Sequence, residues 1–132
     1  MATRNLLLTA EQQEFAALAA EIVKKELSPR VAELDRTGEF PMDVMDALRE
    51  AGFYGMGIPE QYGGLGLDVT TQMAIYEEIA KVDAGFSFNF ALASGEFGLL
   101  ETAGAPEALK RYYAEKILSG SICSFCLTEA QA

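Results

Sequence analysis

The only two cysteines of the chain stand three positions apart near its C-terminus, at Cys123 and Cys126. A C-x-x-C spacing can form a redox dithiol or supply half of a zinc site. Residues 122–128 read as a β-strand, and on a strand positions i and i+3 face opposite sides. The sequence also has no second cysteine pair and no histidine to complete a zinc site. We therefore expect two reduced core cysteines and no metal or redox centre.

Acidic side chains offer a second kind of chemistry, general acid–base catalysis. Glu77 and Glu78 are adjacent in a stretch of helical periodicity, and neighbouring residues on a helix point about 100° apart. Two such side chains do not easily share one substrate atom, so solvent exposure or pairing with arginine is the favoured interpretation. Glu96 is open between a buried acid and an outward-facing side chain at the rim of a pocket.

Five of the twelve glycines fall in residues 53–67, FYGMGIPEQYGGLGL. Glycine-rich loops can cradle phosphates, but this spacing fits neither the P-loop nor the dinucleotide fingerprint. No lysine stands where a phosphate loop would need one. Chain reversal, for which glycine supplies backbone freedom, is the favoured role.

The composition indicates one acidic, apolar-rich domain. Its 132 residues carry a net charge of −10, and half of them are hydrophobic. Such a charge repels nucleic acid and anionic membrane surfaces, so we expect neither as a partner. No apolar run approaches the ~20 residues that span a bilayer, and the first residues lack the pattern of a signal peptide. We expect a cytoplasmic protein.

Helical signals place most of the chain. Thr9 and Gln12 have the spacing of a capping box ahead of an amphipathic stretch. Ser28 with Pro29 can end or kink that helix, with Ser28 as a new cap. Asp68 is a suitable N-cap for a helix over residues 69–82.

The last helical signals complete the expected fold class. Pro106 opens a helix whose Leu109, Tyr112, Tyr113 and Ile117 share a face, and Gly120 ends it. Connections between these segments are short. The pattern predicts an all-α fold, an up-and-down bundle of five to six helices over residues 1–120. Residues 121–132 would begin a β-strand.

Residues 84–100 differ from the other helical stretches because apolar side chains surround the expected helix. Phenylalanines and leucines lie on all sides, and small residues fall between them. A helix of this kind is buried, and its small residues let another group approach the backbone. Plain helix packing is favoured, and a wall of an apolar ligand pocket is the alternative.

Several blocks together resemble a known family. They are LTAEQQEF, PRVAELDRTGEFP, REAGFYGMGIPEQYGGLGLD, YEEIAKVDAGFSF and SICSFCLTEA. In this order they are similar to the N-terminal helical domain of the flavin-dependent acyl-CoA dehydrogenases, running into the first strand of the middle β-domain. The family usually continues the last block as T-E-x-x-A-G-S-D, whereas this sequence ends TEAQA. The family's glutamate base lies in a C-terminal helical domain, so the resemblance implies no catalytic residue within residues 1–132.

The resemblance implies an oxidoreductase that binds FAD and dehydrogenates an acyl-CoA thioester between its α and β carbons. It places flavin contacts at Phe125, Leu127 and Thr128, with the Thr128 hydroxyl on the flavin's polar edge. It implies an acyl-chain pocket lined by the residues Phe88, Ala91, Leu92 and Gly95. It also implies a homodimer or homotetramer that passes electrons to an electron-transferring flavoprotein.

By the same resemblance, residues 1–132 alone are expected to be inactive. Two other interpretations stay open. One is a non-catalytic helical module that uses its apolar faces to bind a partner. The other is a related enzyme that uses the same fold as an oxidase, a reductase or a flavin monooxygenase.

Overall fold

The computed structural model describes residues 7–94, 97–124, 126 and 130, and these residues confirm the expected all-α class. The α-helices are α1 (Ala10–Glu26), α2 (Val31–Thr37), α3 (Met42–Glu50), α4 (Val69–Ala80), α5 (Ala84–Ala93), α6 (Phe97–Thr102) and α7 (Glu107–Leu118). Short 3-10 helices are η1 (Ser28–Arg30), η2 (Phe53–Gly55) and η3 (Glu60–Tyr62). None of the described helices is both long and apolar enough to cross a membrane.

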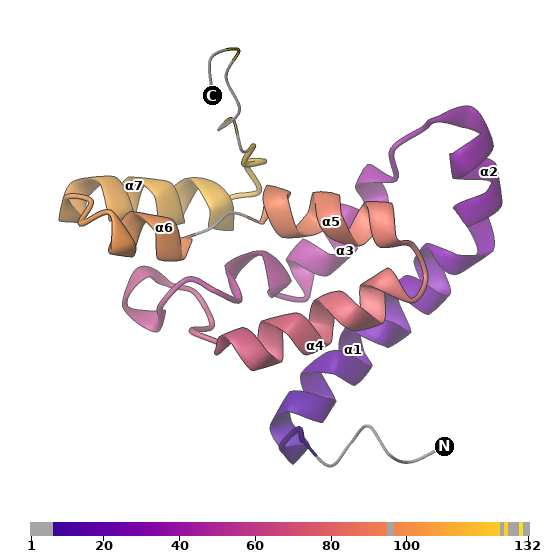
Figure 1. The fold of residues 1–132 in the computed structure, drawn as a ribbon, viewed down its shortest axis with the longest axis horizontal. Coiled ribbons are helices and arrows are strands. Elements are labelled where there is room, and N and C mark those ends of the chain that lie inside the picture. The colour runs from indigo at the N-terminus through magenta and orange to yellow at the C-terminus, as the bar shows by residue number, and fades with distance from the viewer. Residues whose placement is uncertain (1–6, 95–96, 125, 127–129, 131–132) are drawn as a thin grey trace.

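Helix α4 occupies the middle of the bundle, between α1 and α5 (Figure 1). Helices α6 and α7 lie side by side at one end, and α2 lies at the other (Figure 1). Burial of apolar side chains between these layers is the main source of stability. The largest fully buried side chains are Val23, Leu27, Val44, Met45, Leu48, Phe53, Met56, Ile58, Ile75, Ile79 and Phe90.

Side-chain caps fix the starts of the helices that the site depends on. The Thr9 hydroxyl accepts a hydrogen bond from Gln12 N, and the Gln12 side chain accepts one from Thr9 N, so the predicted capping box is confirmed. Asp68 accepts from Thr71 N at 2.7 Å, which confirms it as the cap of α4. Asp83 caps α5 in the same way, through Phe86 N at 2.8 Å. Each cap satisfies an amide at the helix start that has no partner within the helix.

The glycine-rich stretch reverses the chain, as expected, by bonding its own backbone. Leu65 N donates to Gly55 O at 2.9 Å, Gly66 N to Ile58 O at 2.9 Å, and Leu67 N to Met56 O at 2.7 Å. Gly64 fits between the two sides: a Cβ there would stand 2.0 Å from Ile58 O. The stretch is therefore a compact turn with two 3-10 helices, η2 and η3, and not an open phosphate loop.

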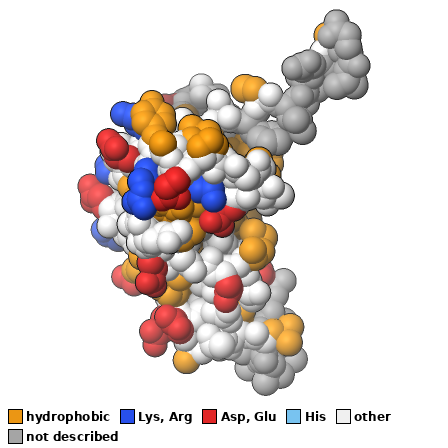
Figure 2. All heavy atoms as spheres, turned by 90° about the vertical axis from the view of Figure 1, so that its left-hand side faces the viewer, with side chains coloured by type: hydrophobic (Ala, Val, Ile, Leu, Met, Phe, Trp, Pro, Cys, Tyr) orange, Lys and Arg blue, Asp and Glu red, His pale blue; other side chains and the backbone are white. Residues whose placement is uncertain are grey.

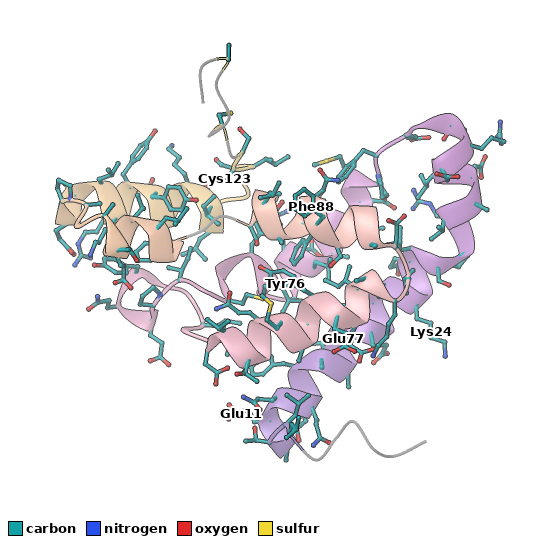
Figure 3. The ribbon with its side chains drawn as sticks, in the orientation of Figure 1. Glu11, Lys24, Tyr76, Glu77, Phe88 and Cys123 are labelled. Atoms are coloured by element: carbon teal, nitrogen blue, oxygen red, sulfur yellow. The ribbon has the colours of Figure 1, made fainter. Side chains whose placement is uncertain are left out.

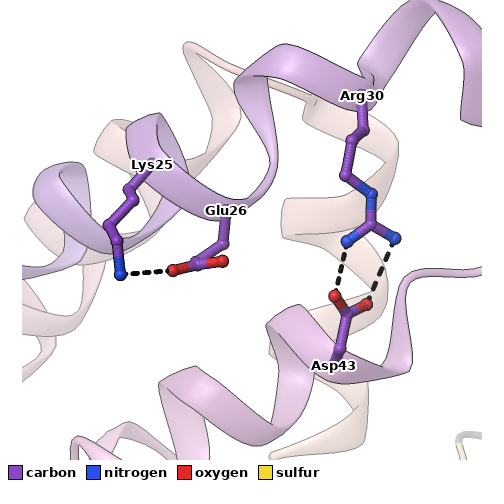
Figure 4. Close-up of polar contacts among 4 residues, drawn as sticks. All are labelled: Lys25, Glu26, Arg30 and Asp43. Atoms are coloured by element: carbon purple, nitrogen blue, oxygen red, sulfur yellow. Dashed lines mark hydrogen bonds and ion pairs between the residues drawn. The ribbon is translucent and has the colours of Figure 1, made fainter.

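A bidentate ion pair joins η1 to the start of α3 at the surface. Both guanidinium nitrogens of Arg30 donate to the carboxylate of Asp43, and Lys25 pairs with Glu26 nearby (Figure 4). The hydrogen bond from Arg30 lowers the pKa of Asp43 and raises that of Arg30. Because both groups are solvent-exposed, the pair fixes geometry more than it adds stability.

Three details of the expected helices are wrong. The segment 84–100 is not one helix, because α5 ends at Ala93 and α6 starts afresh at Phe97. Ser28 is not a helix cap, since it lies inside η1 and makes no side-chain capping bond there. The third wrong detail is the buried face of α7, which consists of Ala114 and Ile117 and not of the predicted set.

The predicted face of α7 is split between core and solvent. Leu109 and Tyr112 are exposed although they were grouped with Ile117. Figure 2 shows this end of the molecule, where lysine and arginine side chains gather among acidic ones beside apolar patches. Lys116 lies over the Tyr112 ring at 5.4 Å, and Arg111 lies over the Tyr62 ring at the same distance. In such cation–π contacts the electron-rich face of the ring attracts the cation, which contributes roughly 0.5–1 kcal/mol at exposed sites.

Candidate functional site

Helix α5 is positioned by its buried side. Phe86, Phe90 and Ala93 face the core, and the Ser87 hydroxyl donates to Tyr76 O of α4 at 2.9 Å. That hydrogen bond and the Asp83 cap fix the helix both in rotation and in height. The remaining side of α5 is therefore presented outward in one defined orientation.

The residues predicted to line an acyl pocket lie on that outward side. Phe88, Ala91 and Leu92 stand at helical spacings of three and four, so they share one face of α5. Phe88 is 66% exposed, whereas Ala91 and Leu92 are half-buried. The expectation that this helix is buried all round is wrong. Gly95, the fourth predicted residue, lies outside the described residues.

A groove opens between α4 on one side and α5 and α6 on the other, with a volume of about 490 Å³. Apolar side chains with large exposed fractions border it: Val69 at 69%, Met73 at 52% and Leu99 at 48%. The described residues that line it are Gly57, Val69, Gln72, Met73, Tyr76, Ala91, Phe97, Gly98 and Leu99. Of the three predicted pocket residues that the structure describes, Ala91 lines this groove, whereas Phe88 and Leu92 do not.

Tyr76, which is labelled in Figure 3, and Gln72 are the polar side chains among the described residues that line the groove. The Tyr76 ring meets Phe90 edge-on, with centroids 6.1 Å apart, and its hydroxyl lies 3.5 Å from Ser94 Oγ. Ser94 is buried and donates to Ala91 O at 3.1 Å. In the sequence, Met73 and Tyr76 stand three positions apart within the helical stretch 69–82, a spacing that is equally typical of plain helix packing.

The described lining carries no acidic or basic side chain, so the groove suits an alkyl chain more than an ion. Glu77 and Glu78 do not point to acid–base chemistry, because both pair with Lys81. The expectation of exposure or ion pairing is confirmed for them, although the partner is lysine. Glu96 lies outside the described residues. Among the residues that the structure describes, no cluster of ligating side chains could hold a metal ion.

The residues assigned to the flavin, Phe125, Leu127 and Thr128, lie outside the described residues. Of the predicted strand, residues 122–124 and 126 are described, and none of these four is in a β-strand. The chain approaches the residues assigned to the flavin through Cys123, whose backbone N donates to Ala93 O at the end of α5, 3.1 Å away. Both cysteines are free thiols. Cys123 is half-buried against the core, whereas Cys126 is exposed, so the prediction of two core cysteines is wrong for Cys126. The described stretch therefore passes directly beside the predicted acyl wall.

Comparison with known proteins decides the family. Residues 9–121 match the family profile described as "Acyl-CoA dehydrogenase, N-terminal domain". The chain belongs to the acyl-CoA dehydrogenase family. Members of this family are flavin-dependent.

Relatives of known sequence and structure agree with this assignment. A probable acyl-CoA dehydrogenase of Mycobacterium leprae is 32% identical over 95% of this chain and 32% of its own length. A 3-sulfinopropanoyl-CoA desulfinase of Variovorax paradoxus is 34% identical over 95% of this chain and 31% of its own. The butyryl-CoA dehydrogenase structure from Megasphaera elsdenii superposes with a TM-score of 0.84 at 32% identity, covering 95% of this chain and 34% of that one.

The length of the match limits what the family assignment covers. The chain spans about a third of the acyl-CoA dehydrogenase relatives that it matches. The matched third is the helical N-terminal domain, which contains the groove and helix α5. Activity, substrate and partners belong to the whole enzyme.

Proposed function

We propose that this chain is the N-terminal helical part of an FAD-dependent acyl-CoA dehydrogenase, an oxidoreductase that introduces a double bond between the α and β carbons of an acyl-CoA thioester. The observation that carries the proposal is the uncharged apolar groove between α4 and α5–α6 in a domain of this family. An acyl chain is apolar and unbranched or lightly branched, and such a lining takes it without leaving a polar group unpaired.

The chain's own residues would bind and orient the acyl group. Phe88, Ala91 and Leu92 offer an apolar face on α5, and Ala91 shares the groove with Met73 and Tyr76 of α4. Gly95 stays a predicted member of the acyl wall. Excluding water there strengthens the polar interactions that act on the thioester. No proton transfer is assigned to this chain, because the described groove lining has no titratable carboxylate. By the family resemblance, the general base is a glutamate of the C-terminal helical domain.

The chemistry of the predicted flavin residues suits FAD. Thr128 brings a hydroxyl that can donate to, or accept from, the polar edge of the ring, and Phe125 and Leu127 bring apolar and main-chain contact. FAD, when bound, supplies the acceptor for the hydride that leaves the β carbon.

The decisive experiment uses the full-length protein. Purified protein should show flavin absorbance and should reduce a dye acceptor with at least one member of an acyl-CoA panel of graded chain length. Residues 1–132 alone should show neither flavin absorbance nor acyl-CoA oxidation. Absence of flavin from the full-length protein would contradict the proposal, and so would stoichiometric flavin in the isolated 132-residue chain.

The desulfinase relative favours a second candidate, a related acyl-CoA reaction on the same fold, because its identity to this chain is as high as that of the dehydrogenase relatives. The same panel decides between them when 3-sulfinopropanoyl-CoA is included. Loss of the sulfinate group without dye reduction would indicate the desulfinase-like reaction. A stable full-length protein with neither flavin nor turnover would instead favour the non-catalytic helical module.

Partners follow from the same proposal. A dehydrogenase of this kind passes electrons to an electron-transferring flavoprotein and assembles as a homodimer or homotetramer. The exposed apolar side chains Val69, Met73, Phe88 and Leu99 supply surface for contact with other parts of the enzyme. The cytoplasmic location stays a prediction from the sequence.

A further inference from the structure

Two hydrogen bonds hold the stretch that follows α7 against the rest of the bundle. Gly120, with φ of 95°, turns the chain away from α7. Three residues later, Cys123 N donates to Ala93 O of α5 at 3.1 Å, and the Tyr113 hydroxyl donates to Cys123 Sγ at 3.1 Å. Figure 3 shows Cys123 in the space between the ends of α5 and α7. The residue thus connects two helices that are far apart in the sequence.

Tyr113 is a firmly held donor. Its ring is 6.3 Å from that of Phe97, which in turn lies 5.0 Å from the ring of Tyr62. Tyr62 is fixed by a 2.8 Å hydrogen bond to Glu107 and by Arg111 over its face. Aromatic rings that pack against one another at a tilt and are held by hydrogen bonds have few alternative orientations, so the Tyr113 hydroxyl is presented at one position.

The turn before Cys123 is also confined. A Cβ at Gly120 would meet the side chain of Arg49 at 3.1 Å, so the backbone passes close to α3 there. Ser121 N donates to Lys116 O at 2.9 Å and closes the end of α7. The path from α7 to Cys123 is therefore fixed at both ends, by hydrogen bonds of the backbone and by the Tyr113 side chain.

We propose that Tyr113 and Cys123 are positioning residues that set the spacing between the acyl wall on α5 and the flavin-contacting stretch, and this rests on the proposed function. Ala93, whose carbonyl oxygen accepts the hydrogen bond from Cys123 N, is two residues from Ala91 of the acyl wall. Phe125, the first assigned flavin contact, is two residues beyond Cys123. The hydrogen bonds of Cys123 to Ala93 and to Tyr113 therefore connect the segment assigned to the acyl group with the segment assigned to the cofactor.

Tyr113 and Cys123 would affect the relative position of substrate and cofactor without taking part in the reaction. Misplacing reacting groups by about 1 Å can lower a rate on the order of 100-fold, but sulfur is a weak acceptor and the backbone bond to Ala93 survives loss of the Tyr113 hydroxyl. We therefore expect a moderate effect, about 2- to 10-fold, as for loss of one ordinary hydrogen bond.

The experiment uses the full-length flavoenzyme with Tyr113→Phe, which removes only the hydroxyl. The matched control is Tyr112→Phe, the same change at the next residue, whose side chain is 57% exposed. Cys123→Ala removes the acceptor, and Cys123→Ser restores an acceptor of similar size. Readouts are the FAD dissociation constant from flavin fluorescence, kcat and KM for the acyl-CoA, and the alkylation rate of the Cys123 thiol in a Cys126→Ser background.

Tyr113→Phe and Cys123→Ala should each weaken FAD binding and lower kcat by about 2- to 10-fold while KM changes less than about 2-fold. Tyr113→Phe should also speed alkylation of Cys123. Cys123→Ser and Tyr112→Phe should match the wild type in FAD binding, kcat and KM.

Two results overturn the proposal. One is wild-type FAD affinity, kcat and alkylation rate in Tyr113→Phe. The other is that Tyr113→Phe and Cys123→Ala lower the melting temperature but leave FAD affinity and kcat unchanged, because loss of a purely structural contact would have that effect. If the wild-type protein binds no flavin, the proposed function fails and the proposal with it, whereas the alkylation rates still report whether Tyr113 holds Cys123.

Discussion

Replacing Gly64 by alanine is the sharpest test of how the glycine-rich turn is built. The added Cβ would stand 2.0 Å from Ile58 O, 2.5 Å from Ile58 Cβ and 2.6 Å from Gly55 O, while ordinary contact begins at 3.4 Å. Two of these atoms are backbone oxygens, which no rotamer change can move. The two sides of the turn must therefore separate by more than about 1 Å.

The energy of that separation follows from the bonds it strains. Leu65 N to Gly55 O and Gly66 N to Ile58 O, both 2.9 Å, cross the turn on either side of Gly64. Losing two backbone hydrogen bonds at about 1 kcal/mol each, with desolvated carbonyls left behind, lowers the free energy of unfolding by about 2–4 kcal/mol. The groove should widen as well, because Gly57 belongs both to this turn and to the groove lining.

Urea denaturation followed by far-ultraviolet circular dichroism measures the change in the 132-residue chain. Gly98→Ala is the matched control, because a Cβ there meets nothing within 4 Å and the residue is helical. It should leave stability unchanged or raise it by up to about 1 kcal/mol. If Gly64→Ala unfolds within about 0.5 kcal/mol of the wild type, the backbone crossing does not carry the turn and the reasoning is wrong.

Three further changes test other parts of the molecule. The backbone hydrogen bond from Thr71 holds the pKa of Asp68 below its ordinary 3.8, so this stabilisation is present above that pH and is lost as pH falls through the lowered pKa; Asp68→Asn should therefore flatten the acid side of a melting-temperature profile below about pH 4, and an unchanged profile would contradict this. Phe90→Ala, at a fully buried ring against Tyr54 and Tyr76, should destabilise the chain by about 3–5 kcal/mol in urea denaturation. In the full-length enzyme, Ala91→Leu should lower kcat/KM for long acyl chains about 10-fold relative to short ones, because its bulk enters the groove; equal losses at every chain length would remove Ala91 from the acyl wall.

Local chemistry made part of the fold predictable. The caps at Thr9 and Asp68 depend on residues three positions away, so the sequence alone contains both partners of each hydrogen bond. The turns at Gly52 and Gly120 are equally local, since both need a positive φ that glycine adopts freely. Such features need no knowledge of the remaining fold.

Features that depend on distant neighbours were not predictable in this way. Phe88 and Tyr112 look like core residues in their helical patterns, yet both are largely exposed. Their burial depends on which helix packs across from them, which periodicity cannot specify. Likewise, Met73 and Tyr76 are site candidates because α4 packs against α5 and shares a groove with α5 and α6, which the sequence pattern of α4 alone does not specify.

The self-bonded turn of residues 53–67 has a consequence for how such proteins are recognised. Gly64 is required there because two stretches of main chain cross at that point, which is a demand of the fold and not of a reaction. A glycine pattern that reflects a backbone turn identifies the fold of a protein and does not specify the reaction that the protein catalyses. Database searches anchored on it will group dehydrogenases with a desulfinase, and only the residues bordering the bound acyl group and the flavin can separate them.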